Sequence, residues 1–160
     1  MNLVMAVERA TLVPTPEDDA IELWVTQALE TANRSLSPSP ELSIRITDTD
    51  EAAQFNETYR AKAGATNVLS FPATPPPETH SGLLGDLVIC APLVIEEAQT
   101  QDKQATAHWA HLVMHGVLHL LGYDHQTSAE AEAMELLEIS ALARLGYANP
   151  YDMKTPLGSP

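Results

Sequence analysis

Hydrophobic residues recur along this chain with two different periods, which predict strands and helices in alternation. Leu42, Ile44 and Ile46 alternate with polar neighbours, as in a strand with one buried face. From Ile21 to Ala32, apolar residues return every three or four positions, as along one face of a helix. This alternation indicates an α/β fold class. Further strands are expected at Met1–Val7, Thr66–Pro72 and Leu83–Cys90.

Capping signals mark where the expected helices begin. Thr15 and Pro16 supply a capping hydroxyl and a proline suited to the first helical position. Asp48 is expected to cap a short helix that carries Phe55 and Tyr59 on one side. Three further helices are expected: one opened by Pro92, one running through His108 to Leu121 after a break near Gln101–Asp102, and one from a capping box of Thr127 with Glu130 to Gly146.

The composition indicates one domain with a substantial core. The chain has 160 residues, of which 44% are hydrophobic, and this is too short for two comfortable domains. We expect a single domain over residues 1–148 and a flexible tail over 149–160, which contains Pro150, Pro156 and Pro160. The stretch from Pro72 to Gly82 is expected to be a proline-rich loop.

Cysteine use and hydropathy bear on the compartment. Cys90 is the only cysteine, so neither an intramolecular disulfide nor a cysteine zinc finger can form. The first ten residues lack a basic region, and no run of about 18 apolar residues occurs anywhere in the chain. The sequence therefore shows no export or membrane segment and favours the cytoplasm.

The charge of the chain limits how it can contact nucleic acid. The formal net charge is −14, with only eight Lys and Arg residues. Nonspecific affinity for nucleic acid normally comes from many Lys and Arg side chains that neutralise phosphates. A broad basic binding surface is therefore excluded, any contact with nucleic acid is local, and no DNA binding is expected.

Three histidines near the end of one helix have the spacing of metal ligands. His115 and His119 are four residues apart and share a helix face. Gly122 can adopt the left-handed conformation that ends the helix and returns His125 over the same face. Catalytic zinc sites have three protein ligands and one open position, whereas structural sites have four. The motif predicts one catalytic zinc ion at a helix C-terminus.

The same stretch allows two other interpretations, one of the activity and one of the ligand set. Metzincin peptidases share the spacing of the histidines, but Gly116 occupies the position of their general-base glutamate. His111 with His115 forms another pair four residues apart, although only the later pair is close enough to Gly122 for His125 to complete the site. His108 and His111 then either support the site, face the substrate or are exposed.

Arg60 and Lys62 place two of the eight basic residues between an expected helix and the next strand. A guanidinium fork suits phosphate and, beside a metal, can stabilise charge in a phosphoryl-transfer transition state. The ordinary alternative is a solvated surface charge. Ser70 and Asp86 are polar residues in otherwise apolar strands. Ser70 is a candidate for substrate binding, and the ordinary alternative for both residues is that they face solvent or cap a turn. Asp124 either orients a histidine or water at the metal, or fixes the turn.

Several blocks of this sequence resemble the YbeY family of bacterial rRNA maturation endoribonucleases. They are His115–His125, which reads HGVLHLLGYDH, together with Tyr59–Lys62, Thr66–Pro72 and Gly85–Asp86, in the family's order. Asn67 departs from the pattern, since the family usually has aspartate there. The resemblance implies a single α/β domain, with a small mixed sheet of about four strands flanked by about five helices. It also implies a metal held by the three histidines and a cleft beside Arg60.

The same resemblance implies a zinc-dependent, single-strand-specific endoribonuclease. Its expected work is rRNA processing, including maturation of the small-subunit rRNA 3′ end, and ribosome quality control. The expected partners are RNA, chiefly rRNA, and the ribosome or its small subunit. No general base stands out, which keeps open a non-enzymatic ribosome assembly factor whose metal orders the helix and turn. A zinc peptidase is the second alternative, and imidazole ligands also suit copper, nickel and iron.

Overall fold

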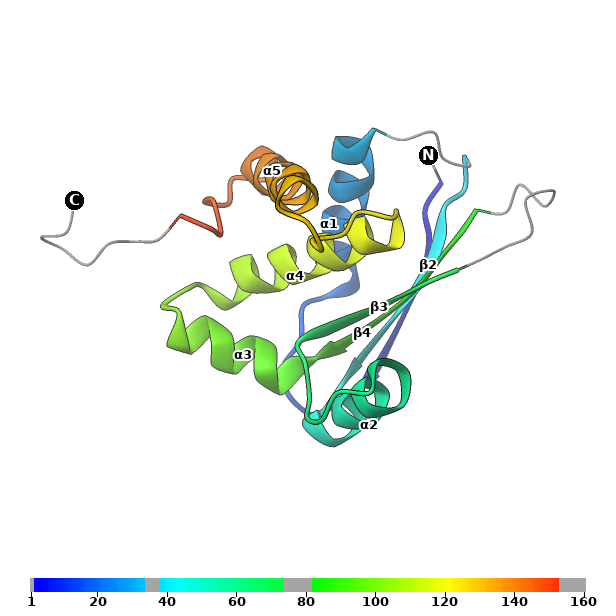
Figure 1. Ribbon diagram of the computed structural model, residues 1–160, viewed down its shortest axis with the longest axis vertical. Helices are drawn as coiled ribbons and strands as arrows, with labels where there is room; N and C mark the ends of the chain where they lie inside the picture. The colour runs from blue at the N-terminus through cyan, green and yellow to red at the C-terminus, as the bar shows by residue number, and fades with distance from the viewer. Residues whose placement is uncertain (1, 34–37, 74–81, 153–160) are drawn as a thin grey trace, which may run out of the picture.

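The computed structural model of this chain describes residues 2–33, 38–73 and 82–152 (Figure 1). Within these ranges four strands and five helices follow one another, as the sequence pattern predicted. Their bounds are β1 (Val4–Ala10), α1 (Asp18–Ala32), β2 (Glu41–Thr47), α2 (Thr49–Arg60), β3 (Val68–Pro72), β4 (Leu83–Cys90), α3 (Ala91–Thr100), α4 (Ala105–Leu120) and α5 (Ser128–Arg144).

The strands form one mixed sheet in the order β1-β2-β4-β3. β1 pairs with β2 and β2 with β4 in parallel, and β3 pairs with β4 in the antiparallel direction. The α/β class that the sequence pattern predicted and the mixed sheet that the family resemblance implied are both confirmed. Because β3 lies at the sheet edge beside β4, the loop that precedes β3 is brought close to the helices that follow β4.

The helices cover the sheet unequally. In Figure 1, α1, α4 and α5 lie on one side of the sheet and α2 lies on the other. The main core is on the first side, where apolar residues of α1, β2, β4 and α4 are almost fully buried, among them Trp24, Leu29, Ile44, Ile89, Val113 and Met114. Burial of this apolar area is the dominant favourable term in folding. It holds α4, the helix with the histidines, firmly against the sheet.

The expected helix starts were correct at one cap and wrong at another. Thr127 and Glu130 form the predicted capping box at the start of α5. The Thr15 cap of α1 was wrong, because α1 begins at Asp18 and the Thr15 hydroxyl accepts a hydrogen bond from Arg9 Nε at 2.7 Å. Asp48 does stand at the N-cap of α2, but without a side-chain bond to that helix.

Two of the expected segments lie largely outside the described residues. They are the proline-rich loop, which falls mainly on 74–81, and the end of the tail, 153–160. In the part of the chain that the structure describes, none of the helices combines the length and the apolar character needed to cross a membrane. The division into a domain and a flexible tail stays a prediction.

Gly85 of β4 has no room for a side chain beside β3. Its φ is +139°, and a Cβ there would lie 2.2 Å from the Phe71 carbonyl oxygen. Gly85→Ala cannot keep the pairing of Gly85 with Pro72, because a backbone atom is in the way. We expect the free energy of unfolding to fall by about 3 kcal/mol or more. The melting temperature should then fall by roughly 6–12 °C, measured by calorimetry.

The matched control is Gly64→Ala. Gly64 also has a positive φ, +86°, but a Cβ there would meet nothing within 4 Å. Only the conformational cost of about 1 kcal/mol should appear. If both variants lost the same stability, the contact with Phe71 would not be what requires glycine at position 85.

Candidate metal centre

Three histidines converge at the end of α4. The ring centroids of His115 and His119 are 4.6 Å apart, and His125 lies 5.1 Å from His119 and 5.9 Å from His115. One nitrogen of each ring lies within 4.8 Å of the others. Two nitrogens bound to the same zinc ion at about 2.0–2.1 Å are roughly 3.4 Å apart in a tetrahedron. The spacing of the donors therefore fits a metal after small side-chain rotations.

The turn that returns His125 is a helix C-cap of the Schellman type. Gly122 has φ +99°, and its N–H donates to the His119 carbonyl oxygen at 3.0 Å. The N–H of Tyr123 donates to the Leu118 carbonyl oxygen at 3.1 Å. This pair of bonds defines the motif. The prediction that Gly122 ends the helix and brings His125 back to the same face is confirmed.

His119 lies in surroundings that favour its neutral form. Burial lowers its pKa from the ordinary value, and the positive charges of His115 and His125 would lower it further. A metal takes the neutral imidazole, whose nitrogen lone pair is free. The electrostatics of the cluster are therefore compatible with the donor set.

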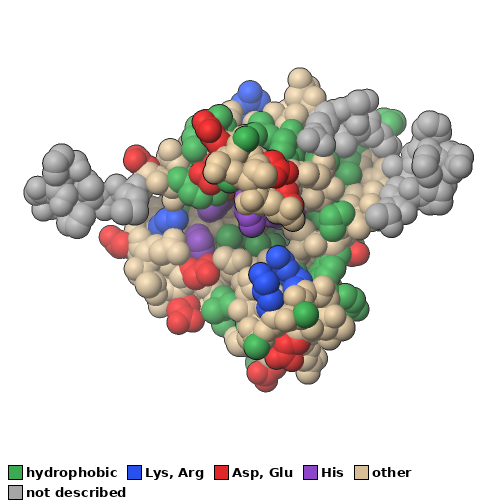
Figure 2. Space-filling view, in the orientation of Figure 1, with side chains coloured by type: hydrophobic (Ala, Val, Ile, Leu, Met, Phe, Trp, Pro, Cys, Tyr) green, Lys and Arg blue, Asp and Glu red, His purple; other side chains and the backbone are tan. Residues whose placement is uncertain are grey.

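The histidines form one wall of a cleft of about 600 Å³. Arg60 at the end of α2 and Lys62 just after it line the same cleft, as do Ser70 and Asp124. Figure 2 shows histidine side chains in a recess, faced by a group of Lys and Arg side chains from the side of α2. A small cationic wall thus stands opposite the candidate metal ligands.

Ser70 and Asp124 each have a hydrogen-bond partner in the backbone. The Ser70 hydroxyl donates to the Gly116 carbonyl oxygen at 3.2 Å and ties β3 to α4. Asp124 accepts a hydrogen bond from the backbone N–H of His125 at 2.8 Å. The observed bond of Asp124 is thus the turn contact, one of the two roles considered from the sequence.

The structure also brings together a residue that sequence reasoning missed. Glu138 of α5 is fully buried, and its Oε2 lies 2.9 Å from His115 Nδ1. Its Oε1 accepts hydrogen bonds from His111 Nε2 and the Tyr151 hydroxyl. Burial alone would raise the pKa of Glu138, but the bonds to His111 and His115 outweigh it and hold the pKa at about 2. In the sequence, Glu138 has helical spacing from Met134 and Ala141, which are apolar residues on the buried face of α5. A carboxylate on that face was the signal from which Glu138 could have been identified as a functional candidate.

The alternative ligand pair of His111 with His115 is disfavoured by this arrangement. His111, His115 and Glu138 also offer atoms within 4.8 Å of one another, but hydrogen bonds between them account for that spacing. His111 Nε2 contacts Glu138 Oε1 and lies 3.2 Å from the Tyr151 hydroxyl. The later pair together with His125 therefore remains the candidate ligand set.

The structure also shows the surroundings of His108, Asn67 and Gly116. His108 is not exposed: it is 4% accessible, and its Nε2 lies 2.8 Å from Glu97 Oε1. Glu97 also accepts hydrogen bonds from Asn67 Nδ2 at 3.0 and 3.3 Å. The Asn67 amide therefore pairs with Glu97, whereas an aspartate at position 67 would be repelled by the Glu97 carboxylate. A Cβ at Gly116 would lie 2.9 Å from Leu87 Cδ2 and 3.3 Å from Val68 Cγ2, so a larger side chain there would have to displace these side chains of the sheet.

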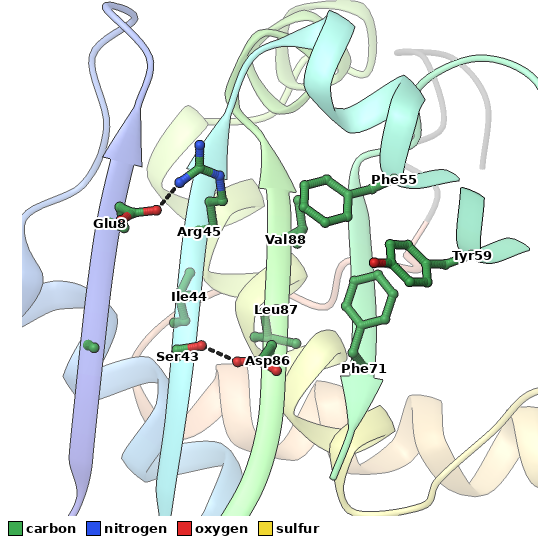
Figure 3. Close-up of a pocket in the computed structure, with 11 residues that line it drawn as sticks. Glu8, Ser43, Ile44, Arg45, Phe55, Tyr59, Phe71, Asp86, Leu87 and Val88 are labelled. Carbon is green, nitrogen blue, oxygen red and sulfur yellow. Dashed lines mark hydrogen bonds and ion pairs between the residues drawn. The ribbon is translucent and has the colours of Figure 1, made fainter. Parts of the chain in front are cut away.

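A second cavity, of about 550 Å³, lies on the opposite side of the sheet (Figure 3). Phe55 and Tyr59 of α2 and Phe71 of β3 contact one another there. Asp86 also lies in this cavity, where its carboxylate accepts a hydrogen bond from Ser43. Asp86 is therefore separated by the sheet from the histidine cluster.

Comparison with known proteins gives a consistent result. A family model described as Endoribonuclease YbeY matches residues 8–146. A protein named Endoribonuclease YbeY from Cellvibrio japonicus is 53% identical over 86% of this chain and 76% of its own length. Proteins of the same name from Methylococcus capsulatus and Pseudomonas putida are 51% and 52% identical, over 92% and 93% of this chain and 94% and 93% of their own lengths.

A solved structure resembles the fold. The solution structure of TM1509 from Thermotoga maritima superposes with a TM-score of 0.57 and 18% sequence identity. The match covers 89% of this chain and 91% of that chain. At this identity the similarity shows the architecture of the domain and nothing about its chemistry.

Proposed function

This chain belongs to the YbeY family of endoribonucleases, and on that premise we propose that it hydrolyses RNA with a metal ion held by His115, His119 and His125. Membership makes it an endoribonuclease and a metal-dependent hydrolase. The observation that carries this proposal is that the three imidazoles and Arg60 line one cleft. A cation and a metal site on opposite walls suit a phosphodiester between them.

We propose zinc as the ion, because three imidazoles with an open position are typical of catalytic zinc. When bound, such an ion supplies Lewis-acid polarisation of a phosphoryl oxygen and activation of water. The roles of the remaining side chains follow from their places in the cleft.

The basic residues hold the phosphate. Arg60 presents a planar fork of donors that can bind two phosphoryl oxygens, and Lys62 adds a point charge at the same wall. Ser70 uses its proton on the Gly116 carbonyl oxygen, so its lone pairs can accept a hydrogen bond from an RNA 2′-hydroxyl. Asp124 fixes the turn that carries His125. These contacts are local, as a chain of net charge −14 requires.

The biological setting is part of the same proposal. We propose that the substrate is single-stranded rRNA, with maturation of the small-subunit rRNA 3′ end and ribosome quality control as the processes served. The ribosome or its small subunit is then the partner, and the cytoplasm is the compartment. The family model covers 8–146, which is compatible with one domain over 1–148.

The test compares two substrates in one assay. Short single-stranded RNA and an unfolded protein are each incubated with metal-free protein and with protein reconstituted with zinc. Cleavage of RNA alone, and only after reconstitution, is the expected result. Hydrolysis of the unfolded protein would instead indicate a peptidase, and no cleavage of either substrate despite bound zinc would favour an assembly factor.

Metal removal should lower stability as well as activity. The three ligands lie on α4 and on the turn after it, so binding to the folded state stabilises this end of the chain. At free zinc a hundredfold above Kd, the gain is about 2.7 kcal/mol. We expect chelation to lower the melting temperature by roughly 5–10 °C, measured by calorimetry with the metal content verified by elemental analysis. An unchanged transition in verified metal-free protein would contradict this.

A further inference from the structure

Glu138 lies beneath the metal site without lining its cleft. Its side chain is fully buried and comes from α5, a different helix from the one that carries His115 and His119. Three donors surround it, namely His111 Nε2, His115 Nδ1 and the Tyr151 hydroxyl. An ionised carboxylate has only acceptors, so each of these three groups must place a proton toward Glu138.

This requirement decides which tautomer His115 adopts. With the proton on Nδ1, at 2.9 Å from Glu138 Oε2, the lone pair of the neutral ring is on Nε2. Nε2 is the other ring nitrogen, away from the edge that contacts Glu138, and the rings of His119 and His125 lie 4.6 and 5.9 Å from the His115 ring. The contact with Glu138 therefore orients the ring and also prepares the donor atom.

Glu138 is itself held in place. Its Oε1 binds both His111 and Tyr151, and the Tyr151 hydroxyl lies 3.2 Å from His111 Nε2. The second nitrogen of His111, Nδ1, is buried and has no hydrogen-bond partner among the described residues, as expected for the unprotonated nitrogen of a ring whose proton is on Nε2. The network connects the segment after α5 to the ligand on α4.

We propose that Glu138 is a positioning residue for the metal, and that Tyr151 and His111 support it. It keeps the His115 proton on Nδ1 so that Nε2 binds the ion, and its buried negative charge increases the basicity of that ligand. Partners of this kind commonly change metal affinity by about 10- to 100-fold. The inference rests on the proposed metal site, and it adds a residue from a helix that contributes no ligand.

The first experiment measures Zn²⁺ affinity by competition with a chromophoric chelator. Glu138→Gln keeps the size of the side chain but removes the charge and offers amide protons toward groups that are already donors. We expect affinity to fall about 10- to 100-fold. Glu132→Gln is the matched control, since it makes the same change at an exposed position of the same helix and should alter affinity by less than about twofold.

The second experiment reads the His115 ring directly. Long-range ¹H–¹⁵N spectra of the zinc-loaded full chain should show His115 protonated on Nδ1 and coordinated through Nε2. Coordination through Nδ1 in the wild type would overturn the proposal, and this result does not depend on whether Glu138→Gln folds. Tyr151→Phe should weaken zinc binding by about two- to tenfold, as expected for one lost hydrogen bond, while Glu138 remains.

The outcomes separate this proposal from the metal site itself. Equal affinities of folded Glu138→Gln and the wild type would overturn the positioning role and leave the three ligands standing. If the wild type bound no zinc, the site would be wrong and this inference with it. A loss of affinity in Glu138→Gln at a metal-free melting temperature close to that of the control would exclude a merely structural role.

Discussion

Replacing His119 with alanine is expected to abolish metal binding and to slow RNA cleavage by at least about a thousandfold. His119 is the middle ligand of the cluster, since its ring is nearest to both of the others. Two imidazoles cannot hold a catalytic ion in place, and the ion's stabilisation of developing charge is worth several kcal/mol. Each 1.36 kcal/mol corresponds to a tenfold change in rate. Single-turnover cleavage of short RNA and elemental analysis measure the two effects.

Gln126→Ala is the control for this variant. Gln126 lines the same cleft but is not a candidate metal ligand, so the metal content should be unchanged and the cleavage rate nearly unchanged. Full metal occupancy in His119→Ala would show that another residue completes the site. If His119→Ala kept full metal occupancy but lost the cleavage rate, His119 would act on the substrate and would not be a metal ligand.

Replacing Arg60 with alanine should lower the cleavage rate by about 10²- to 10³-fold, the loss that follows removal of one donor to a developing negative charge. Metal content and the melting temperature should be unchanged, because Arg60 is exposed at the end of α2 and lines the cleft opposite the histidines. Few other basic groups are present in this acidic chain, and among the described residues Lys62 is the one that shares the cleft.

Arg60→Lys distinguishes charge from geometry. An ammonium keeps the charge but loses the planar fork, so a loss of at least about tenfold is expected here too. Arg144→Ala is the matched control, an exposed guanidinium on α5 that does not line the cleft. Single-turnover rates at matched metal occupancy decide the matter. Wild-type rates from Arg60→Ala would make this residue an ordinary solvated charge.

The parts of the structure that were predicted correctly depend on neighbours in the chain. The period of α4 places His115 and His119 on one face, and the positive φ of Gly122 returns His125, all within eleven residues. The capping box of Thr127 with Glu130 is equally local. Such features follow from helix geometry and from the conformational freedom of glycine, and both can be evaluated without knowing the rest of the fold.

The incorrect prediction at Thr15 shows how a distant group overrides a local preference. Its hydroxyl is well suited to cap a helix, but Arg9 at the end of β1 donates to it, and α1 begins three residues later. Asn67 is a second example of a distant partner. The family usually has aspartate at this position, but the Asn67 amide donates to Glu97, thirty residues away on α3. Side-chain partners of this kind are chosen by the packed structure and not by the flanking residues.

By itself, then, the sequence determined the α/β alternation, the C-terminal end of α4, the two ends of α5 and the convergence of three histidines. Only the tertiary structure placed Arg60 in the same cleft as those histidines, because the sheet order β1-β2-β4-β3 brings the segment after α2 next to α4. It also brought Glu138 to His115 across 23 residues. Local periodicity specifies which face a residue occupies, whereas the residue it meets there depends on how the faces of different elements pack together.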